Sequence, residues 1–248
     1  MSHLVIDLGN TRWKLARTCC GDLLDVAVGS YDRTDDLRAA VLEGGSGIRG
    51  VFYASVAGAE STRLIAASIE QALGLPVTQV LSTDRVPGVT SGYRKPEQLG
   101  VDRLMAMVAV RAVCRAPFCV VDAGTAVTID FVDANGLHLG GVILPGSRVF
   151  RECLLAATAI PRDAQVDDSA QLGRDTPTAV SLGARYAVAG IVERFTTGTS
   201  ALFPGESVQV FVGGGDAGRY IDVLPTACTK MDNLVLRGLA VVAASGDH

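Results

Sequence analysis

Two short stretches of this 248-residue chain combine a carboxylate, a glycine and small polar side chains directly after an apolar run. The first is Asp7-Leu8-Gly9-Asn10-Thr11, and the second is Asp122-Ala123-Gly124-Thr125. A tight turn that contains glycine brings backbone N–H groups close to a bound oxyanion, and Asn or Thr adds donors without bulk. The aspartate cannot bind phosphate directly, since both are negative, but it can hold a cation against the phosphate oxygens. These residue types therefore indicate phosphate binding.

Either stretch alone could be an ordinary hairpin turn, for which Asp, Gly and Asn are all common. The second stretch, however, repeats the pattern of the first at an offset of 115 residues, with Asp122 at the place of Asp7. Two copies at matching places favour a nucleotide polyphosphate held between two such turns. Lys14 lies three residues beyond Thr11, so on a strand it could reach back over the first turn as a point charge.

The apolar patterning and the turn signals predict the elements that position these stretches. The first half should hold a meander of three strands, followed by alternating helices and strands. The expected strands are 4–8, 12–17, 23–29, 50–56 and 77–81, and the expected helices are 35–42 and 61–73, the second capped by Ser61. A polar connector, 82–98, then leads to an apolar helix, 99–115, which Pro117 stops.

The second half repeats this plan. After the strand that carries Asp122, strands are expected at 128–132, 139–144 and 208–212, with helices after Pro145-Gly146, at 177–195 and at 232–244. Two halves that each open with a strand meander imply a duplicated α/β fold, with a cleft between two lobes. We expect the lobes to comprise residues 1–116 and 117–248.

The composition limits the possible partners. A formal net charge of −4 and an isoelectric point near 5.4 provide no long-range attraction for nucleic acid. No stretch approaches about 18 consecutive apolar residues, and no basic segment precedes an apolar one at the start, so a soluble, cytoplasmic protein without membrane contact is expected. The cysteines form no C-x-x-C pair and are expected to be buried free thiols: Cys19, Cys20, Cys114, Cys119, Cys153 and Cys228.

Asp102 and Arg103 lie at the first turn of the expected helix 99–115. The partial positive charge of a helix start stabilises an ionised carboxylate, so Asp102 could orient a hydroxyl group and accept its proton late in a phosphoryl transfer. A stabilising charge without a catalytic role is the alternative. The planar guanidinium group of Arg103 could bind a substrate carboxylate through two parallel hydrogen bonds. The alternative is that Arg103 forms an ordinary surface salt bridge.

Three glycine-rich or acidic segments need a separate interpretation. The run from Gly213 to Gly218 formally satisfies G-x-G-x-x-G, but too little chain follows for a dinucleotide fold, so these glycines are expected to pass under an adenine or ribose. The segment from Gly140 to Gly146 reads as a strand that ends in a Pro-Gly turn and shapes a substrate pocket. The segment 163–175 reads as a solvated acidic loop without phosphate contact. A Walker A sequence is absent.

Taken in order, DLGNTRWK, LGVDR, DAGTAVTID, GGVILPG, DTPTAVSLG and VGGG span Asp7 to Gly215. This series resembles the pattern of type III pantothenate kinases, members of the superfamily of acetate kinase, sugar kinases, Hsp70 and actin. The resemblance implies two ribonuclease H-like lobes, each a mixed sheet flanked by helices. It also implies ATP-dependent phosphorylation of the primary hydroxyl of pantothenate, the first step of coenzyme A synthesis.

The resemblance further assigns roles to individual residues. It makes Asp102 the catalytic base and Asp122 the ligand of a monovalent cation, K⁺ or NH₄⁺, while Mg²⁺ accompanies ATP. It implies a homodimer in which Thr176 completes the pantothenate site of the partner subunit. The residues implied for ATP are Asp7, Leu8, Gly9, Asn10, Thr11, Arg12, Trp13, Lys14 and Thr125, and those implied for pantothenate are Tyr93, Gly100, Val101, Asp102, Arg103 and Thr176.

Two other classes of function stay open from the sequence. One is a regulatory protein on the same scaffold, since some relatives are described as accessory factors for transcription. The chain has no basic stripe and retains the positions assigned to catalysis, which argues against this alternative. The other is a kinase of another small alcohol or a phosphatase of the same superfamily, because a fold does not determine a substrate.

Overall fold

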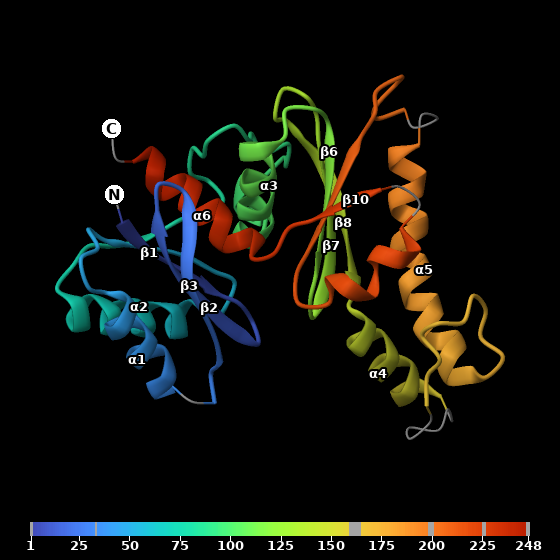
Figure 1. Cartoon of the computed structure of the whole chain (residues 1–248), viewed down its shortest axis with the longest axis horizontal. Helices are drawn as coiled ribbons and strands as arrows, with labels where there is room; N and C mark the ends of the chain where they lie inside the picture. Colours follow the sequence, from blue (N-terminus) through green and yellow to red (C-terminus); the bar gives the residue numbers. More distant parts are fainter. Residues whose placement is uncertain (1, 33, 159–164, 198–200, 225–226, 247–248) are drawn as a thin grey trace. The chain divides into compact units, whose positions relative to one another are not determined.

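The computed structural model describes residues 2–32, 34–158, 165–197, 201–224 and 227–246 (Figure 1). The chain forms two compact units. Unit 1 comprises Met1–Arg115, Asn135–His138 and Asn233–His248, and unit 2 comprises Ala116–Ala134 and Leu139–Asp232. The chain first passes from unit 1 to unit 2 between Arg115 and Ala116, one residue before the boundary expected from the sequence. The C-terminal residues differ from that expectation, since they belong to unit 1.

Unit 1 is built on a five-stranded sheet with the order β3-β2-β1-β4-β5. Its strands are β1 (Ser2–Leu8), β2 (Arg12–Cys19), β3 (Asp22–Ser30), β4 (Val51–Ser55) and β5 (Val77–Gln79). The central strand β1 runs antiparallel to β2 and parallel to β4. Residues 3–6 of β1 are all buried, because both faces of the sheet are covered by helices, and this explains the apolar run without alternation.

Helices cover the two faces of this sheet (Figure 1). On one face, α1 (Thr34–Gly44) and α2 (Ala59–Leu73) pack on an apolar core that includes Ile6 and Leu15. On the other face lie α3 (Val101–Val113), which follows the short helix η1 (Pro96–Gln98), and α6 (Leu234–Ser245). A Cβ atom on Gly238 would lie 2.1 Å from the carbonyl oxygen of Met105, so only glycine lets α6 approach α3 this closely. This packing explains why the C-terminal helix belongs to unit 1.

Unit 2 repeats the sheet of unit 1 with the order β10-β9-β6-β7-β8. Its strands are β6 (Phe118–Ala123), β7 (Ala126–Val132), β8 (His138–Pro145), β9 (Gln209–Gly213) and β10 (Cys228–Lys230). The central strand β6 is antiparallel to β7 and parallel to β9, just as β1 is to β2 and β4. The duplication expected from the sequence is thus confirmed in the topology of two mixed sheets.

The helices of unit 2 are α4 (Ser147–Ala157) and α5 (Thr176–Thr196), with the short helices η2 (Ala217–Arg219) and η3 (Ile221–Val223) after β9. Figure 1 shows α5 along one face of the second sheet. Val188 and Val192 of α5 are buried there against Val121 and Ile129. The glycine run after β9 leads into η2 and not into a long helix, in agreement with the rejection of a dinucleotide motif.

Several sequence-based expectations differ from the structure in detail. Helix α2 begins at Ala59 with Gly58 at its N-cap, so the prediction that Ser61 caps this helix is wrong. The strand β10 was not predicted, because an edge strand of three residues carries little apolar signal. The first part of the acidic segment, 163–164, lies outside the described residues. The described part is anchored, since Nη1 of the buried Arg185 donates to the carbonyl oxygen of Asp168 at 2.8 Å.

The cysteines are all free thiols, but the expectation that they are buried is wrong for most of them. Only Cys114 and Cys119 are buried, whereas Cys20 and Cys153 are exposed on the surface. Burial, with a smaller contribution from Asp130, raises the pKa of the Cys119 thiol and makes it unreactive. None of the helices in the described part of the chain combines the length and the apolar content that crossing a membrane requires.

Candidate functional site

The first turn lies at the end of the central strand of unit 1. Asp7 is the penultimate residue of β1, and three residues, Gly9 to Thr11, connect β1 to β2. The N–H group of Gly9 donates to the carbonyl oxygen of Arg12 at 3.1 Å and closes the turn. Asp7 lies opposite Lys14 across the two strands, so the carboxylate and the ammonium group extend from neighbouring positions on one face of the sheet.

A tyrosine directly after β3 supports this turn. The hydroxyl group of Tyr31 donates to the carbonyl oxygen of Gly9 at 2.9 Å. Burial, and to a smaller extent the negative charge of Asp7, raises the pKa of Tyr31 to about 12. The hydroxyl group therefore stays protonated and keeps its donor at neutral pH. Sequence reasoning missed Tyr31, because 22 residues separate it from the turn it supports.

Two residues of the first motif turn their side chains into the core. Leu8 is 1% exposed and Trp13 is 3% exposed. Because these side chains pack in the core beneath α1 and α2, any contact that they make with a nucleotide would come from their backbone atoms. The polar members of the motif behave differently, since the side chains of Asn10, Thr11 and Arg12 are exposed.

The second turn lies at the equivalent place in unit 2. Asp122 is the penultimate residue of β6, and Gly124 and Thr125 alone connect β6 to β7. The N–H group of Gly124 donates to the carbonyl oxygen of Ala126 at 2.9 Å, as the N–H group of Gly9 does in the first turn. Asp122, however, lies opposite the neutral Thr128. The second turn is thus one residue shorter than the first and lacks a cationic neighbour across the strands.

Two glycines from other segments, Gly146 and Gly214, pack closely against the second turn. Gly146, the N-cap of α4, donates its N–H group to the carbonyl oxygen of Thr125 at 2.9 Å, and a Cβ atom there would lie 2.1 Å from the carbonyl oxygen of Gly124. Gly214, after β9, has a φ of +92°, and its Cβ atom would lie 2.5 Å from Oδ1 of Asp122. The start of α4 therefore lies against Gly124 and Thr125, and the segment after β9 lies against Asp122. A helix start with backbone N–H groups favours an anion, and the carboxylate favours a cation.

A second group of candidate residues lies in unit 1 at the start of α3. Asp102 belongs to the first turn of this helix, as predicted, and its Oδ1 atom accepts the N–H group of Arg103 at 2.8 Å. Gly100 is the N-cap, and a Cβ atom there would lie 2.4 Å from this oxygen. The glycine therefore provides the space into which the Asp102 carboxylate folds back over the helix start.

Tyr93 and Arg103 are brought together although ten residues separate them. Nη1 of Arg103 donates to the hydroxyl oxygen of Tyr93 at 2.7 Å, and the guanidinium carbon lies 5.6 Å from the centre of the tyrosine ring. Arg103 is only 5% exposed, so the alternative of a surface salt bridge is wrong. The ring of Tyr93 stacks on His138, with 5.5 Å between the ring centres. His138 is fully buried and was missed, because nothing in its local sequence connects it to α3.

Thr176 is the exposed first residue of α5 in unit 2. Its neighbour Asp175 caps this helix, since the carboxylate accepts the N–H group of Thr178 at 2.8 Å and its hydroxyl group at 2.9 Å. Asp175 is thus a structural residue, which explains one charge of the acidic segment. Within the described ranges, no cluster of three or more His, Cys, Asp or Glu side chains has the arrangement of a metal centre.

Solved structures of other proteins share the general fold of this chain. Over 98% of its length it resembles the ethanolamine utilization protein EutJ of Carboxydothermus hydrogenoformans, with a TM-score of 0.59, 14% identity and 90% of that chain covered. It also resembles a Campylobacter jejuni protein described as a member of the Baf family of transcriptional activators, with a TM-score of 0.62, 20% identity, and 99% and 100% of the two chains covered. These likenesses concern the duplicated, actin-like fold.

The sequence comparisons are more specific. The family model of type III pantothenate kinases matches residues 3–198. A type III pantothenate kinase of Aromatoleum aromaticum is 37% identical over an aligned length of 248, and the match covers 97% of each chain. One from Halorhodospira halophila is 32% identical over 235 residues, covering 95% of this chain and 90% of the relative. The chain therefore belongs to the type III pantothenate kinase family.

Proposed function

We propose that this protein transfers the γ-phosphoryl group of ATP to the primary hydroxyl group of pantothenate, giving 4′-phosphopantothenate for coenzyme A synthesis. Family membership over most of the chain carries this assignment. The two relatives found by sequence, from Aromatoleum aromaticum and Halorhodospira halophila, are named type III pantothenate kinases, and this does not favour a purely regulatory role on the same scaffold. The turns and the start of α3 supply the groups that such a transfer needs.

Asp102 is proposed as the catalytic base. A carboxylate at a helix start is stabilised in its ionised form, and the Asp102 carboxylate is oriented by the N–H group of Arg103 at 2.8 Å. In a loose phosphoryl-transfer transition state the attacking hydroxyl group loses its proton late, so the carboxylate needs to orient the hydroxyl more than to deprotonate it. An oriented carboxylate of ordinary basicity is sufficient for this role.

Arg103 and Tyr93 are proposed to hold the carboxylate of pantothenate. A buried guanidinium that is already oriented by the Tyr93 hydroxyl loses little conformational freedom when it binds an anion. Gly100 and Val101 would contribute through the backbone around the start of α3, since Gly100 is the N-cap and the Val101 side chain is buried.

The two turns are proposed to hold the polyphosphate of ATP and its cations. In the first, Asp7 would face the Mg²⁺ side of ATP, while Asn10, Thr11, Arg12 and Lys14 offer polar or cationic side chains. In the second, Thr125 would contact ATP. Asp122 would bind K⁺ or NH₄⁺, because its carboxylate oxygen and the carbonyl oxygen of Ala123 both lie next to Gly214, and oxygen atoms are the ligands that hard cations prefer. The bound cation would offset the phosphate charge.

A homodimer is proposed as the functional form, with Thr176 contributed to the partner's pantothenate site. Helix α4 is amphipathic, yet none of its residues is buried, and Val149, Phe150 and Leu154 are only partly covered. In the same unit, Leu172 is 78% exposed and Tyr186 is 40% exposed. A second copy would cover this apolar surface.

The direct test is an assay of ADP release with pantothenate and MgATP, run in sodium, potassium and ammonium salts. We expect turnover with pantothenate, and we expect it to need potassium or ammonium. Asp102→Asn should keep the fold but lower kcat by about 10² to 10⁴, the usual contribution of a general base. Glu97→Gln is the matched control, because Glu97 is an exposed carboxylate in η1 just before the same helix. Activity of Asp102→Asn equal to that of the control would remove Asp102 from catalysis.

A further inference from the structure

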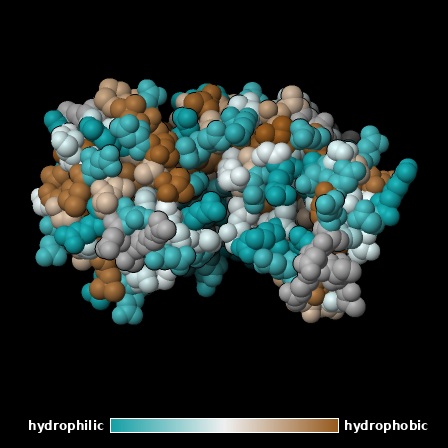
Figure 2. All heavy atoms as spheres, turned by 60° about the horizontal axis from the view of Figure 1, so that its bottom comes forward, coloured by the Kyte–Doolittle hydropathy of each residue, from teal (hydrophilic) through white to brown (hydrophobic). Residues whose placement is uncertain are grey.

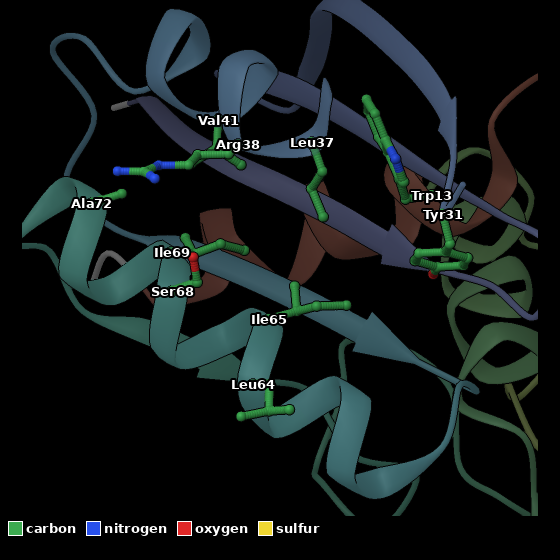
Figure 3. A pocket seen from close by; sticks show the side chains of 10 residues that line it. All are labelled: Trp13, Tyr31, Leu37, Arg38, Val41, Leu64, Ile65, Ser68, Ile69 and Ala72. Atoms are coloured by element: carbon green, nitrogen blue, oxygen red, sulfur yellow. The ribbon is translucent and has the colours of Figure 1, made fainter. Parts of the chain in front are cut away.

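A cavity of about 210 Å³ lies in unit 1 between α1, α2 and one face of the sheet (Figure 3). Its walls are mainly aliphatic, with Leu37 and Val41 from α1 and Ile65 and Ile69 from α2. A cavity of about 150 Å³ with such a lining binds benzene in another protein, so this one has room for a ring with a short substituent. None of the residues proposed to hold pantothenate lines it.

The two ends of this cavity differ in chemistry. Figure 3 shows Trp13 and Tyr31 at one end, and the guanidinium group of Arg38 with the hydroxyl group of Ser68 at the other. Arg38 is exposed, so a ligand could reach it from solvent. An occupant with an apolar body and an anionic group at one end would match this arrangement. A planar guanidinium favours a carboxylate, which it can bind through two parallel hydrogen bonds.

The aromatic end holds a polar group without an acceptor. Nε1 of Trp13 is buried, and the described residues offer it no hydrogen-bond partner. A buried donor that stays unsatisfied is unfavourable, and an acceptor brought by an occupant would remove this cost. Because Trp13 is 3% exposed, water in bulk solvent does not replace that acceptor. An oxygen atom on the far side of the occupant's ring would meet this requirement.

Tyr31 connects the cavity to the first turn. Its ring lines the cavity, and its hydroxyl group donates to the carbonyl oxygen of Gly9 at 2.9 Å. Gly9 follows Asp7 by two residues in the turn proposed to hold ATP. A ligand packed against the Tyr31 ring restricts this side chain and, through its hydrogen bond, the turn. This coupling, unlike the binding itself, rests on the proposed function.

We propose that the cavity between α1 and α2 is a regulatory site for a small aromatic carboxylate with an oxygen substituent on its ring. The carboxylate binds Arg38 and Ser68, the ring fills the aliphatic middle, and the ring oxygen accepts the N–H group of Trp13. Occupancy holds Tyr31 and orders the first turn for ATP.

Binding can be measured without any enzymatic reaction, because Trp13 is the only tryptophan of the chain. Titration of the nucleotide-free protein with 4-hydroxyphenylacetate should change the tryptophan emission in a saturable manner. Phenylacetate, which lacks the ring oxygen, and the uncharged 4-hydroxyphenylacetamide should each bind at least about fivefold more weakly, since each lacks one of the two polar contacts.

Variants then locate the site. Arg38→Gln should weaken binding of 4-hydroxyphenylacetate about tenfold or more, because it removes the charge from an exposed position without disturbing the core. Arg63→Gln is the matched control, since Arg63 is an exposed arginine of α2 outside this cavity, and it should bind as the unmodified protein does. Ile65→Phe should abolish binding by filling the cavity. No saturable change in emission, or equal affinity of Arg38→Gln and Arg63→Gln, would overturn the proposal.

The coupling is tested by kinetics with pantothenate and MgATP. Saturating 4-hydroxyphenylacetate should lower the KM for ATP about fivefold, the lower end of typical allosteric coupling, with kcat little changed. Tyr31→Phe should still bind the acid by fluorescence but lose this effect on KM. An unchanged KM in the unmodified protein, with binding observed, would overturn the regulatory part. If the chain did not phosphorylate pantothenate at all, the fluorescence titration would still decide whether the site exists.

Discussion

The two turns that end β1 and β6 occupy equivalent places in two sheets of the same topology, but they are supported differently. In unit 1, a side chain supports the turn, since the Tyr31 hydroxyl group bonds to Gly9. In unit 2, backbone supports it, since Gly146 and Gly214 approach so closely that a Cβ atom on either would collide with the turn. Figure 2 shows the mixed polar and apolar surface of one face of the molecule, which does not reveal this difference.

The residues that lie opposite the two aspartates across the strands also differ. Asp7 has Lys14 across the strands, whereas Asp122 has Thr128. A carboxylate that already faces an ammonium group gains less from a bound monovalent cation than one whose neighbour is neutral. The two aspartates are therefore expected to respond differently to substitution.

The largest expected difference between the two turns concerns the cation. Asp122→Asn should abolish activation by potassium and lower activity in potassium about 10² fold, because it removes the anionic oxygen proposed as the cation ligand. Asp7→Asn should instead raise the KM for MgATP and keep the ratio of activity in potassium to that in sodium. The measurement is kcat and KM in both salts. If both variants keep the potassium activation, the proposed division between the turns is wrong.

The next effect concerns the glycines. Gly214→Ala should lower the free energy of unfolding by about 2–4 kcal/mol, because φ is +92° and the new Cβ would meet the carbonyl oxygen of Ala123 at 2.2 Å. Gly9→Ala should cost about 1 kcal/mol, since its Cβ would meet one carbonyl oxygen at 3.0 Å.

Gly215→Ala is the control for this pair, because its Cβ would have open space in the same loop. Urea denaturation followed by tryptophan fluorescence and circular dichroism gives the free energies of unfolding. Equal losses for Gly214→Ala and Gly9→Ala would contradict the view that only the second turn depends on close backbone contact.

A smaller effect is expected from the tyrosines. Tyr31→Phe should lower the free energy of unfolding by about 1 kcal/mol, the value of one hydrogen bond. Tyr220→Phe should cost somewhat more, because Tyr220 is fully buried and its removal leaves the Ser147 hydroxyl group, 2.9 Å away, without this partner. In kinetics, Tyr31→Phe should raise the KM for ATP with little change in kcat. No change in either quantity would exclude Tyr31 as a support of the first turn.

The smallest effect concerns pH. The pKa of Tyr31 is raised from 10.0 to about 12, so the folded protein keeps a proton that the unfolded chain releases above pH 10. The stability from this group is complete below pH 10 and is lost as the pH rises towards 12. Because the side chain is partly solvated, the loss should be about 1 kcal/mol or less. The measurement is the free energy of unfolding as a function of pH for the unmodified protein and for Tyr31→Phe. The two curves should converge as the pH rises.

The sequence by itself determined the repeated plan and the positions of the candidate residues in it. An Asp-x-Gly after an apolar strand is a local pattern, so both turns, the start of α3 with Asp102 and the succession of strands and helices in each half could be read from nearby residues. Individual boundaries were less secure, as Gly58 at the start of α2 and the short strand β10 show. Local signals at a helix cap or an edge strand are weak compared with the packing that decides them.

Only the tertiary structure decided which distant residues support the turns. Tyr31 reaches Gly9, His138 stacks on Tyr93, and Gly214 packs against Asp122, each across a separation that no local pattern encodes. The placement of α6 in unit 1 likewise depends on the close approach of Gly238 to Met105. Such contacts depend on shape and burial in three dimensions, whereas the motifs depend on the conformational preferences of a few consecutive residues.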